Sequence, residues 1–395
     1  MAMTEYLTQE ASLTAVADAI RAQTGSTKAL TFPADFVAGV ENIKKRTAWY
    51  RPPDWPDITS LPLDDVNVEL YFTLDKGLPG TTDTVSLNVI GYNTIVEIGT
   101  MSNGAFVAAN TYENSGVFNV THTLNLSSVE GRFVIVHVLT DGGFDDPRGY
   151  FARQGNWFAS NAPIIEMYGN FVSGRIFNTN YNMKAATLGH EAIDWTSGGL
   201  SLRELPTALE MLDLSNYGGL RISSRFFYSI FSNQRSLKTI KFPDLTQNSL
   251  LLDTDSQANW PTQAFQNCYA LFELDLSFLD MSECTDISQI CDCCYSLQTL
   301  DISGWDLSAL TKINNAFRGC TSLENLITDG CIMPSISFSL SDCTALTVDS
   351  LVGVIAALPE LAEATTATLT LGDTNTAKLT EEQIAVATEK GWTIA

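Results

Sequence analysis

The chain has 395 residues, of which 45% are apolar, so it can bury a large core and is expected to divide into about two to four domains. Its formal net charge of −23 opposes binding to nucleic-acid phosphates or to anionic membrane surfaces. No apolar run reaches the length of a membrane span, so we expect neither nucleic acid nor membrane insertion among its interactions.

Residues 1–46 have the apolar spacing of two short amphipathic helices. Ser12 is placed to cap the first helix, and a Lys-Lys-Arg run at 44–46 closes the second. Two helices this short need a partner surface, and composition alone favours an ordinary helical hairpin. The apolar faces carry Leu13, Val16, Ile20, Phe36, Val40 and Ile43, which the resemblance described below makes the attachment candidates.

Prolines at 52, 53, 56 and 62 predict a stiff, extended connector over 47–65. After it the apolar period changes to two, and turn residues separate several short strands. We therefore expect an antiparallel, β-sandwich-like domain over 66–195. Its last part, from Tyr150 to Trp195, is rich in Asn, Gly and aromatic residues and indicates no topology.

A short phrase, Cys-x-x-Leu, recurs at Cys268, Cys294, Cys320 and Cys343. The first three of these phrases are spaced by 26 residues and the last by 23. Each opens a Leu-x-x-Leu-x-Leu run or a degraded form of it, and two runs upstream fit the same template. A period of this length is typical of a solenoid, which we expect over 196–371, with a carboxyl-terminal cap over 372–395. Residues 347–358 are expected to form a helix on the last turn, and Thr380 with Gln383 is expected to form a capping box that opens another helix.

Alternate side chains of each repeat strand should point outward, because successive residues of a strand face opposite sides. The outward positions then form one rigid surface for binding. Trp260 lies in an insertion that either binds a partner or only bulges into solvent, and Trp305 is expected to pack between turns. The receptor-binding candidates are Thr239, Lys241, Glu273, Asp275, Thr299, Asp301, Asn325 and Trp260.

All eight cysteines lie within the repeats, and four of them occupy the same repeat position. A ladder of buried free thiols is the favoured interpretation, and it implies synthesis in a reducing compartment. The alternatives are a zinc or redox site at Cys291, Cys293 and Cys294, or structural disulfides. No histidine lies near these cysteines, since the three in the chain are His122, His137 and His190.

No residue pattern is specific for catalysis, a cofactor or a metal. The acidic loop at 141–146 could bind calcium, but it lacks the spaced oxygen ligands of a recognised site, so a solvated turn is favoured. His137 and His190 have no sequence partners that would complete a catalytic group, and no glycine loop for phosphate is present. We therefore expect no enzymatic activity, no cofactor and no metal.

Three stretches resemble known families. Leu-Asp-Leu-Ser at 274–277 and Leu-Asp-Ile-Ser-Gly-Trp-Asp-Leu-Ser at 300–308 resemble the bacterial-surface (BspA-like) leucine-rich repeats. Residues 13–43, followed by Tyr-Arg-Pro-Pro-Asp-Trp-Pro-Asp at 50–57, are similar to the amino-terminal piece of phage and prophage structural proteins of Gram-positive bacteria. Residues 369–392 are similar to the closing segment of repeat-bearing phage tail proteins.

The apolar periods together with these resemblances predict a multi-domain α+β fold: an N-terminal helical hairpin, an antiparallel β-sandwich-like domain and a C-terminal leucine-rich-repeat solenoid. They imply a non-enzymatic virion protein of a phage or prophage tail or baseplate. It would be made in the bacterial cytoplasm, dock on other virion proteins through residues 1–46, and bind a protein or glycan receptor on the host surface through its repeats. A homotrimer is a further implication of the resemblance.

Two other classes remain open. A bacterial cell-surface adhesin or secreted interaction protein would share the repeats, and it would be expected to carry oxidised cysteines in the cell envelope. A glycan-degrading enzyme has the weakest support, because no pair of carboxylates stands out among the 45 acidic residues.

Overall fold

The computed structural model describes residues 49, 51–63, 68–90, 92–115, 119–141, 162–170, 182–190, 193–194, 205–217, 220–223, 231–243, 251–253 and 261–395. The chain divides into two compact units, Met1–Ala48 and Trp49–Ala395, and all described residues belong to the second. The predicted helical hairpin with its six attachment candidates lies outside the described residues. So do Trp260 and residues 142–146 of the acidic loop.

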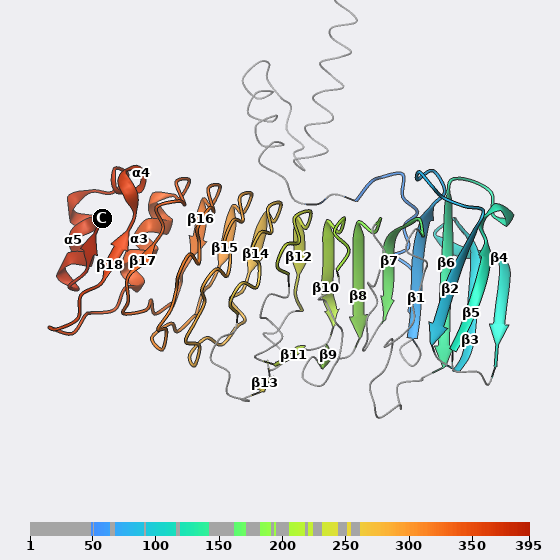
Figure 1. Ribbon diagram of the computed structural model, residues 1–395, viewed down its shortest axis with the longest axis horizontal. Coiled ribbons are helices and arrows are strands. Elements are labelled where there is room, and N and C mark those ends of the chain that lie inside the picture. Colours follow the sequence, from blue (N-terminus) through green and yellow to red (C-terminus); the bar gives the residue numbers. More distant parts are fainter. Residues whose placement is uncertain are drawn as a thin grey trace, which may run out of the picture. The chain divides into compact units, whose positions relative to one another are not determined.

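The largest element is an eight-stranded mixed sheet, seen in Figure 1, in the order β12-β10-β8-β7-β1-β6-β3-β4. Strands β1, β7, β6, β3 and β4 pair antiparallel, whereas β7, β8, β10 and β12 run parallel to one another. The strand bounds are β1 Val68–Asp75, β3 Tyr92–Ser102, β4 Ala105–Asn114, β6 Phe133–Asp141, β7 Ile164–Asn170, β8 Ala185–His190, β10 Met211–Tyr217 and β12 Thr239–Lys241.

Four smaller sheets complete the described strands. One is an antiparallel pair, β2 (Thr84–Ile90) and β5 (Asn119–Asn125), which is followed by the 3-10 turn Leu126–Ser128. Its apolar side chains join the core beneath the large sheet, because Leu87 and Leu124 are fully buried with Phe72 and Val136. The parallel sheets are β9 (Ile193–Asp194) with β11 (Leu220–Ser223) and β13 (Leu251–Asp253); β14 (Glu273–Asp275) with β15 (Thr299–Asp301) and β16 (Asn325–Ile327); and β17 (Phe338–Ser339) with β18 (Thr368–Thr370) and β19 (Thr393–Ile394).

The predicted fold class is wrong. Antiparallel strands assigned to a separate sandwich share one mixed sheet with β10 and β12, which were assigned to the repeats. The later repeat strands lie in separate three-stranded sheets and form no single solenoid sheet. Strands β7 and β8 connect the antiparallel part of this sheet to its parallel part. Both lie between residues 150 and 195, for which the sequence indicates no topology. Every residue of β7 is buried, as expected for a strand that is paired on both edges and covered on both faces.

Helices contribute little to the described part of the chain. They are α3 (Val348–Ala357), α4 (Gly372–Thr376) and α5 (Glu381–Glu389). Thr347 caps α3 through its side chain, as the predicted helix over 347–358 requires. Thr380 and Gln383 form the predicted capping box of α5. Both predictions are therefore confirmed.

The repeated cysteines form the predicted ladder of buried free thiols. Seven of the eight are buried, and Cys293 is partly buried. The Cys294 thiol donates to the Phe265 carbonyl at 3.2 Å, and the Cys320 thiol donates to the Cys291 carbonyl at 3.1 Å. Each ladder thiol thus reaches a backbone oxygen of the preceding turn. Burial raises the pKa of Cys294 and Cys320 well above the ordinary value, so these groups stay protonated.

Trp49 and residues 51–63, here called the strap, cover part of one face of the large sheet. Ile58 and Leu61 are buried against Tyr71 and Tyr168, and the Tyr168 hydroxyl donates to the Leu61 carbonyl at 3.0 Å. The stretch predicted as a connector is therefore packed against strands β1 and β7.

Candidate functional site

The predicted receptor-binding residues that the structure describes lie on β12, β14, β15 and β16. The three later strands pair in parallel, with Glu273 beside Thr299 and Thr299 beside Asn325. Asp275 likewise lies beside Asp301. The side chains of Glu273, Asp275 and Asn325 are exposed, and those of Thr299 and Asp301 are half-buried. These five residues are called the strand face below.

The two candidates on β12 do not join this exposed row. Thr239 is buried, and its hydroxyl accepts a hydrogen bond from the Trp49 backbone N–H at 3.1 Å. Lys241 is exposed, but its ammonium group is 2.8 Å from the Asp213 carboxylate on β10. Thr239 is therefore unavailable to a receptor, and the charge of Lys241 is already neutralised.

The acid before β10 is paired with lysines, whereas the outward acids of β14 and β15 have no base among the outward residues of those strands. Glu210, just before β10, lies 2.9 Å from the Lys184 ammonium and 2.6 Å from that of Lys238. Burial raises the pKa of Glu210, but these two lysines outweigh burial and lower it overall. Beyond β12, the outward positions of β14 and β15 hold three acids and no base. The strand face is therefore acidic.

Two of the strand-face acids also have a local structural role. The Asp275 carboxylate accepts from the Ser277 backbone N–H at 2.9 Å and from its hydroxyl at 2.7 Å. Asp301 accepts from Ser303 in the same way, at 2.9 and 2.6 Å. Each pair closes a turn after its strand. Glu273, Thr299 and Asn325 are therefore the better positions at which to test binding.

Trp305 lies where the sequence predicted, packed between turns. It is 1% exposed, and its indole N–H donates to the Leu276 carbonyl at 2.8 Å. This side chain belongs to the core and is not available to a partner.

Sequence reasoning missed a charged cluster on the antiparallel strands. Both ring nitrogens of His137 on β6 face carboxylates: Nε2 is 2.7 Å from Glu69 on β1, and Nδ1 is 3.0 Å from Glu97 on β3. Tyr71 stacks on the imidazole at 4.4 Å and donates to Glu69 at 2.9 Å. Burial lowers the pKa of His137, but the two carboxylates outweigh burial and raise it above 6.5.

This cluster predicts a pH dependence of stability. Because the pKa of His137 is higher in the folded state, protonation of this group favours folding. The contribution is complete below the unfolded pKa and is lost as pH rises through the folded value. Urea unfolding should show that stability declines as pH rises above about 6, and that this decline is smaller in His137→Gln. An equal decline in both proteins would assign it to other groups.

Comparisons with known proteins give no relative. A scan against protein-family models found no match, and neither the search of curated proteins nor that of solved structures found a significant one. In the part of the chain that the structure describes, no three His, Cys, Asp or Glu side chains gather as a metal ion requires. Among the same residues, no helix is both long and apolar enough to cross a membrane.

Proposed function

We propose that this chain is a non-enzymatic structural protein of a phage or prophage tail or baseplate, and that its strand face binds a receptor on the bacterial surface. The single observation that carries the proposal is the row formed by Glu273, Thr299 and Asn325, held side by side on β14, β15 and β16. The resemblance of residues 13–57 and 369–392 to phage structural proteins supports the assignment to a virion.

The strand face is suited to binding because its backbone is fixed. The Gln298 N–H donates to the Phe272 carbonyl at 2.7 Å, and the Glu324 N–H donates to the Gln298 carbonyl at 3.0 Å. These bonds join each strand to the turn before it. A surface that is already ordered loses little conformational entropy when a partner binds. Its acids favour a partner with basic groups or a bridging cation, whether the partner is a protein or a glycan.

The remaining parts of the proposal concern assembly. Residues 1–46 would dock on other virion proteins, with the apolar side chains of Leu13, Val16, Ile20, Phe36, Val40 and Ile43 as the contact. A homotrimer would present three strand faces to the host surface, which raises avidity without any new contact. Neither nucleic acid nor membrane insertion is expected, because the net charge of −23 disfavours polyanions.

A bacterial cell-surface adhesin or secreted interaction protein is the alternative. The resemblance of residues 274–277 and 300–308 to bacterial-surface repeats favours it. The two functions differ in where the native protein is found and in its thiol state. A virion protein assembled in the cytoplasm keeps eight free thiols, whereas an exported adhesin meets oxidising conditions.

Binding of the fluorescently labelled full chain to cells of a susceptible strain tests the strand face. Replacing Glu273, Thr299 and Asn325 together by lysine should reduce binding at least about tenfold, because three central contacts change charge or shape. Glu363→Lys, an exposed acid distant in sequence, is the charge control and should bind like the wild type. Undiminished binding of the triple variant would contradict the role of the strand face.

A further inference from the structure

Three large side chains from successive repeats lie together, each at the same position in its own turn. Arg235, Tyr269 and Tyr295 each stand four residues before a strand, namely β12, β14 and β15. The rings of Tyr269 and Tyr295 are 5.2 Å apart between centroids, with an interplanar angle of 40°. The Arg235 guanidinium lies 5.1 Å from the centre of the Tyr269 ring. We call these three residues the tyrosine rim.

The fold does not need aromatic side chains at this position. The next two turns hold Thr321 and Thr344 there, and both threonines are exposed. Those turns keep the same ladder cysteine and the same buried leucine, so the shape of the turn does not depend on the residue between them. Tyr295 is 45% exposed and is one of few large apolar side chains so exposed among the described residues. Tyr269 is half-buried beside it, and an aromatic pair that reaches the surface without being required for packing is typical of a contact surface.

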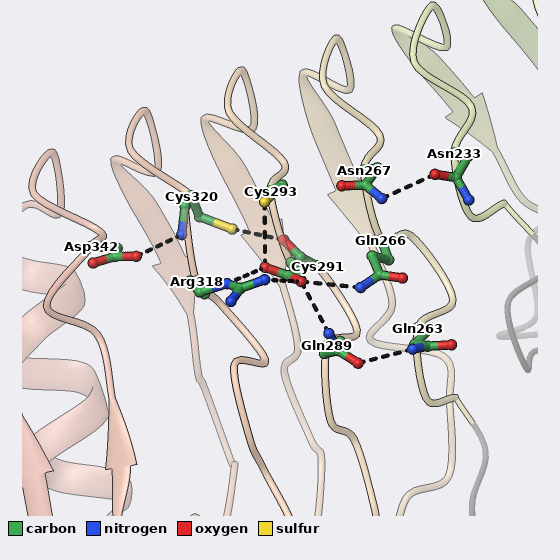
Figure 2. Close-up of polar contacts among 12 residues, drawn as sticks. Asn233, Gln263, Gln266, Asn267, Gln289, Cys291, Cys293, Arg318, Cys320 and Asp342 are labelled. Atoms are coloured by element: carbon green, nitrogen blue, oxygen red, sulfur yellow. Dashed lines mark hydrogen bonds and ion pairs between the residues drawn. The ribbon is translucent and has the colours of Figure 1, made fainter.

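The rim is presented on a rigid backbone. The residue two positions before each tyrosine is left-handed, with φ of 60° at Asn267 and 63° at Cys293, and Gly319 holds the same place in the next turn with φ of 74°. A Cβ added at Gly319 would meet the Tyr295 ring at 3.2 Å, so glycine lets the ring lie close to the next turn. Asn267 and Asn233 stand two residues before Tyr269 and Arg235, and the Asn267 side-chain amide donates a hydrogen bond to the Asn233 side-chain oxygen at 3.0 Å (Figure 2).

The charges near the rim indicate a neutral ligand. Arg318 is held in a bidentate pair by Asp292, with both N–O distances 2.7 Å (Figure 2), so its charge is compensated. Arg235 remains as a donor over the Tyr269 ring. One arginine in a chain of net charge −23 does not attract a polyanion. Rings flanked by amide and guanidinium donors instead suit a ligand with C–H faces and hydroxyl groups.

We propose that the tyrosine rim binds a neutral saccharide chain, with sugar faces stacked on Tyr269 and Tyr295 and hydroxyls hydrogen-bonded to Arg235 and the neighbouring asparagines. This surface is separate from the strand face. It does not depend on membership of a virion, since an adhesin could use it equally. A failure of this inference is therefore distinguishable from a failure of the proposed function.

Affinity electrophoresis of the full chain in gels containing dextran, mannan or galactan tests the inference, with polygalacturonate as the acidic comparison. At least one neutral polysaccharide should retard the protein. The double variant Tyr269→Thr, Tyr295→Thr, which uses the residue of the following turns, should bind at least about tenfold more weakly. Replacing both tyrosines by phenylalanine should retain most of the binding, because the rings remain.

The matched control is Thr321→Ala with Thr344→Ala, which changes the same repeat position outside the rim and should bind like the wild type. Three results would each overturn the inference. They are no retardation by any of the three neutral polysaccharides, equal retardation of the Tyr→Thr variant, and tighter binding to polygalacturonate than to all of them.

Discussion

Replacing Arg51 by methionine should lower the free energy of unfolding by about 3–5 kcal/mol, the usual cost of leaving a buried charge without its partner. Glu166 on β7 is 1% exposed, and the Arg51 guanidinium meets both of its carboxylate oxygens at 2.7 Å. Arg51 also donates to the carbonyl oxygens of Trp55 and Pro56, so one side chain fastens the strap to the sheet. Methionine keeps much of the length but none of the donors.

The pH dependence of this variant distinguishes a buried charge from lost packing. Burial raises the pKa of Glu166 and Arg51 opposes this effect, so removing Arg51 raises the pKa further. A folded-state carboxyl pKa above the unfolded value favours folding as pH falls. Urea unfolding of Arg51→Met should therefore recover part of the lost stability near about pH 5. The double variant Arg51→Met, Glu166→Leu should recover most of the lost stability at neutral pH. If the single and the double variant lose the same free energy of unfolding, this explanation is contradicted.

Replacing Asp292 by alanine should lower the free energy of unfolding by about 3 kcal/mol. The Asp292 carboxylate is not exposed to water, and it accepts several hydrogen bonds. Arg318 donates to both oxygens, and the side-chain amides of Gln266 and Gln289 donate to Oδ2 at 3.1 and 3.3 Å (Figure 2). These donors come from three successive turns, so Asp292 links the turns across their corners. Alanine leaves all of them without this acceptor.

Two variants control for the Asp292 prediction. Asp329→Ala removes an exposed acid of the following turn and should change the free energy of unfolding by no more than about 0.5 kcal/mol. Asp292→Asn keeps the shape of the side chain and one acceptor oxygen. The free energy of unfolding that it loses should therefore lie between the losses of Asp329→Ala and Asp292→Ala. If Asp292→Ala unfolds at the same urea concentration as the wild type, the network does not hold the turns together.

The repeat period allowed local features to be predicted. Residues 26 apart stack in parallel register on β14, β15 and β16, so the buried leucines, the cysteine ladder and the place of Trp305 follow from the sequence spacing. The N-cap of α3 and the capping box of α5 could be predicted because each depends on residues close together in the sequence. Contacts within one period have a regular sequence signal.

Contacts between distant segments had no such signal. Trp49 and Thr239 are separated by 190 residues, and their hydrogen bond removes Thr239 from the exposed row. Arg51 and Glu166 are 115 residues apart. His137 was interpreted as a lone histidine because its carboxylate partners come from two other strands. The tyrosine rim could have been found, since the residue after the ladder cysteine changes from Tyr to Thr between repeats.

Cosedimentation with purified particles, induced from the bacterium that encodes the chain, tests the central claim most directly. We expect the full chain to cosediment, and a variant carrying Leu13→Asp and Ile20→Asp to stay in the supernatant while still binding host cells. Failure of the full chain to associate with any particle, together with its recovery from the cell surface, would contradict the virion assignment and favour the adhesin.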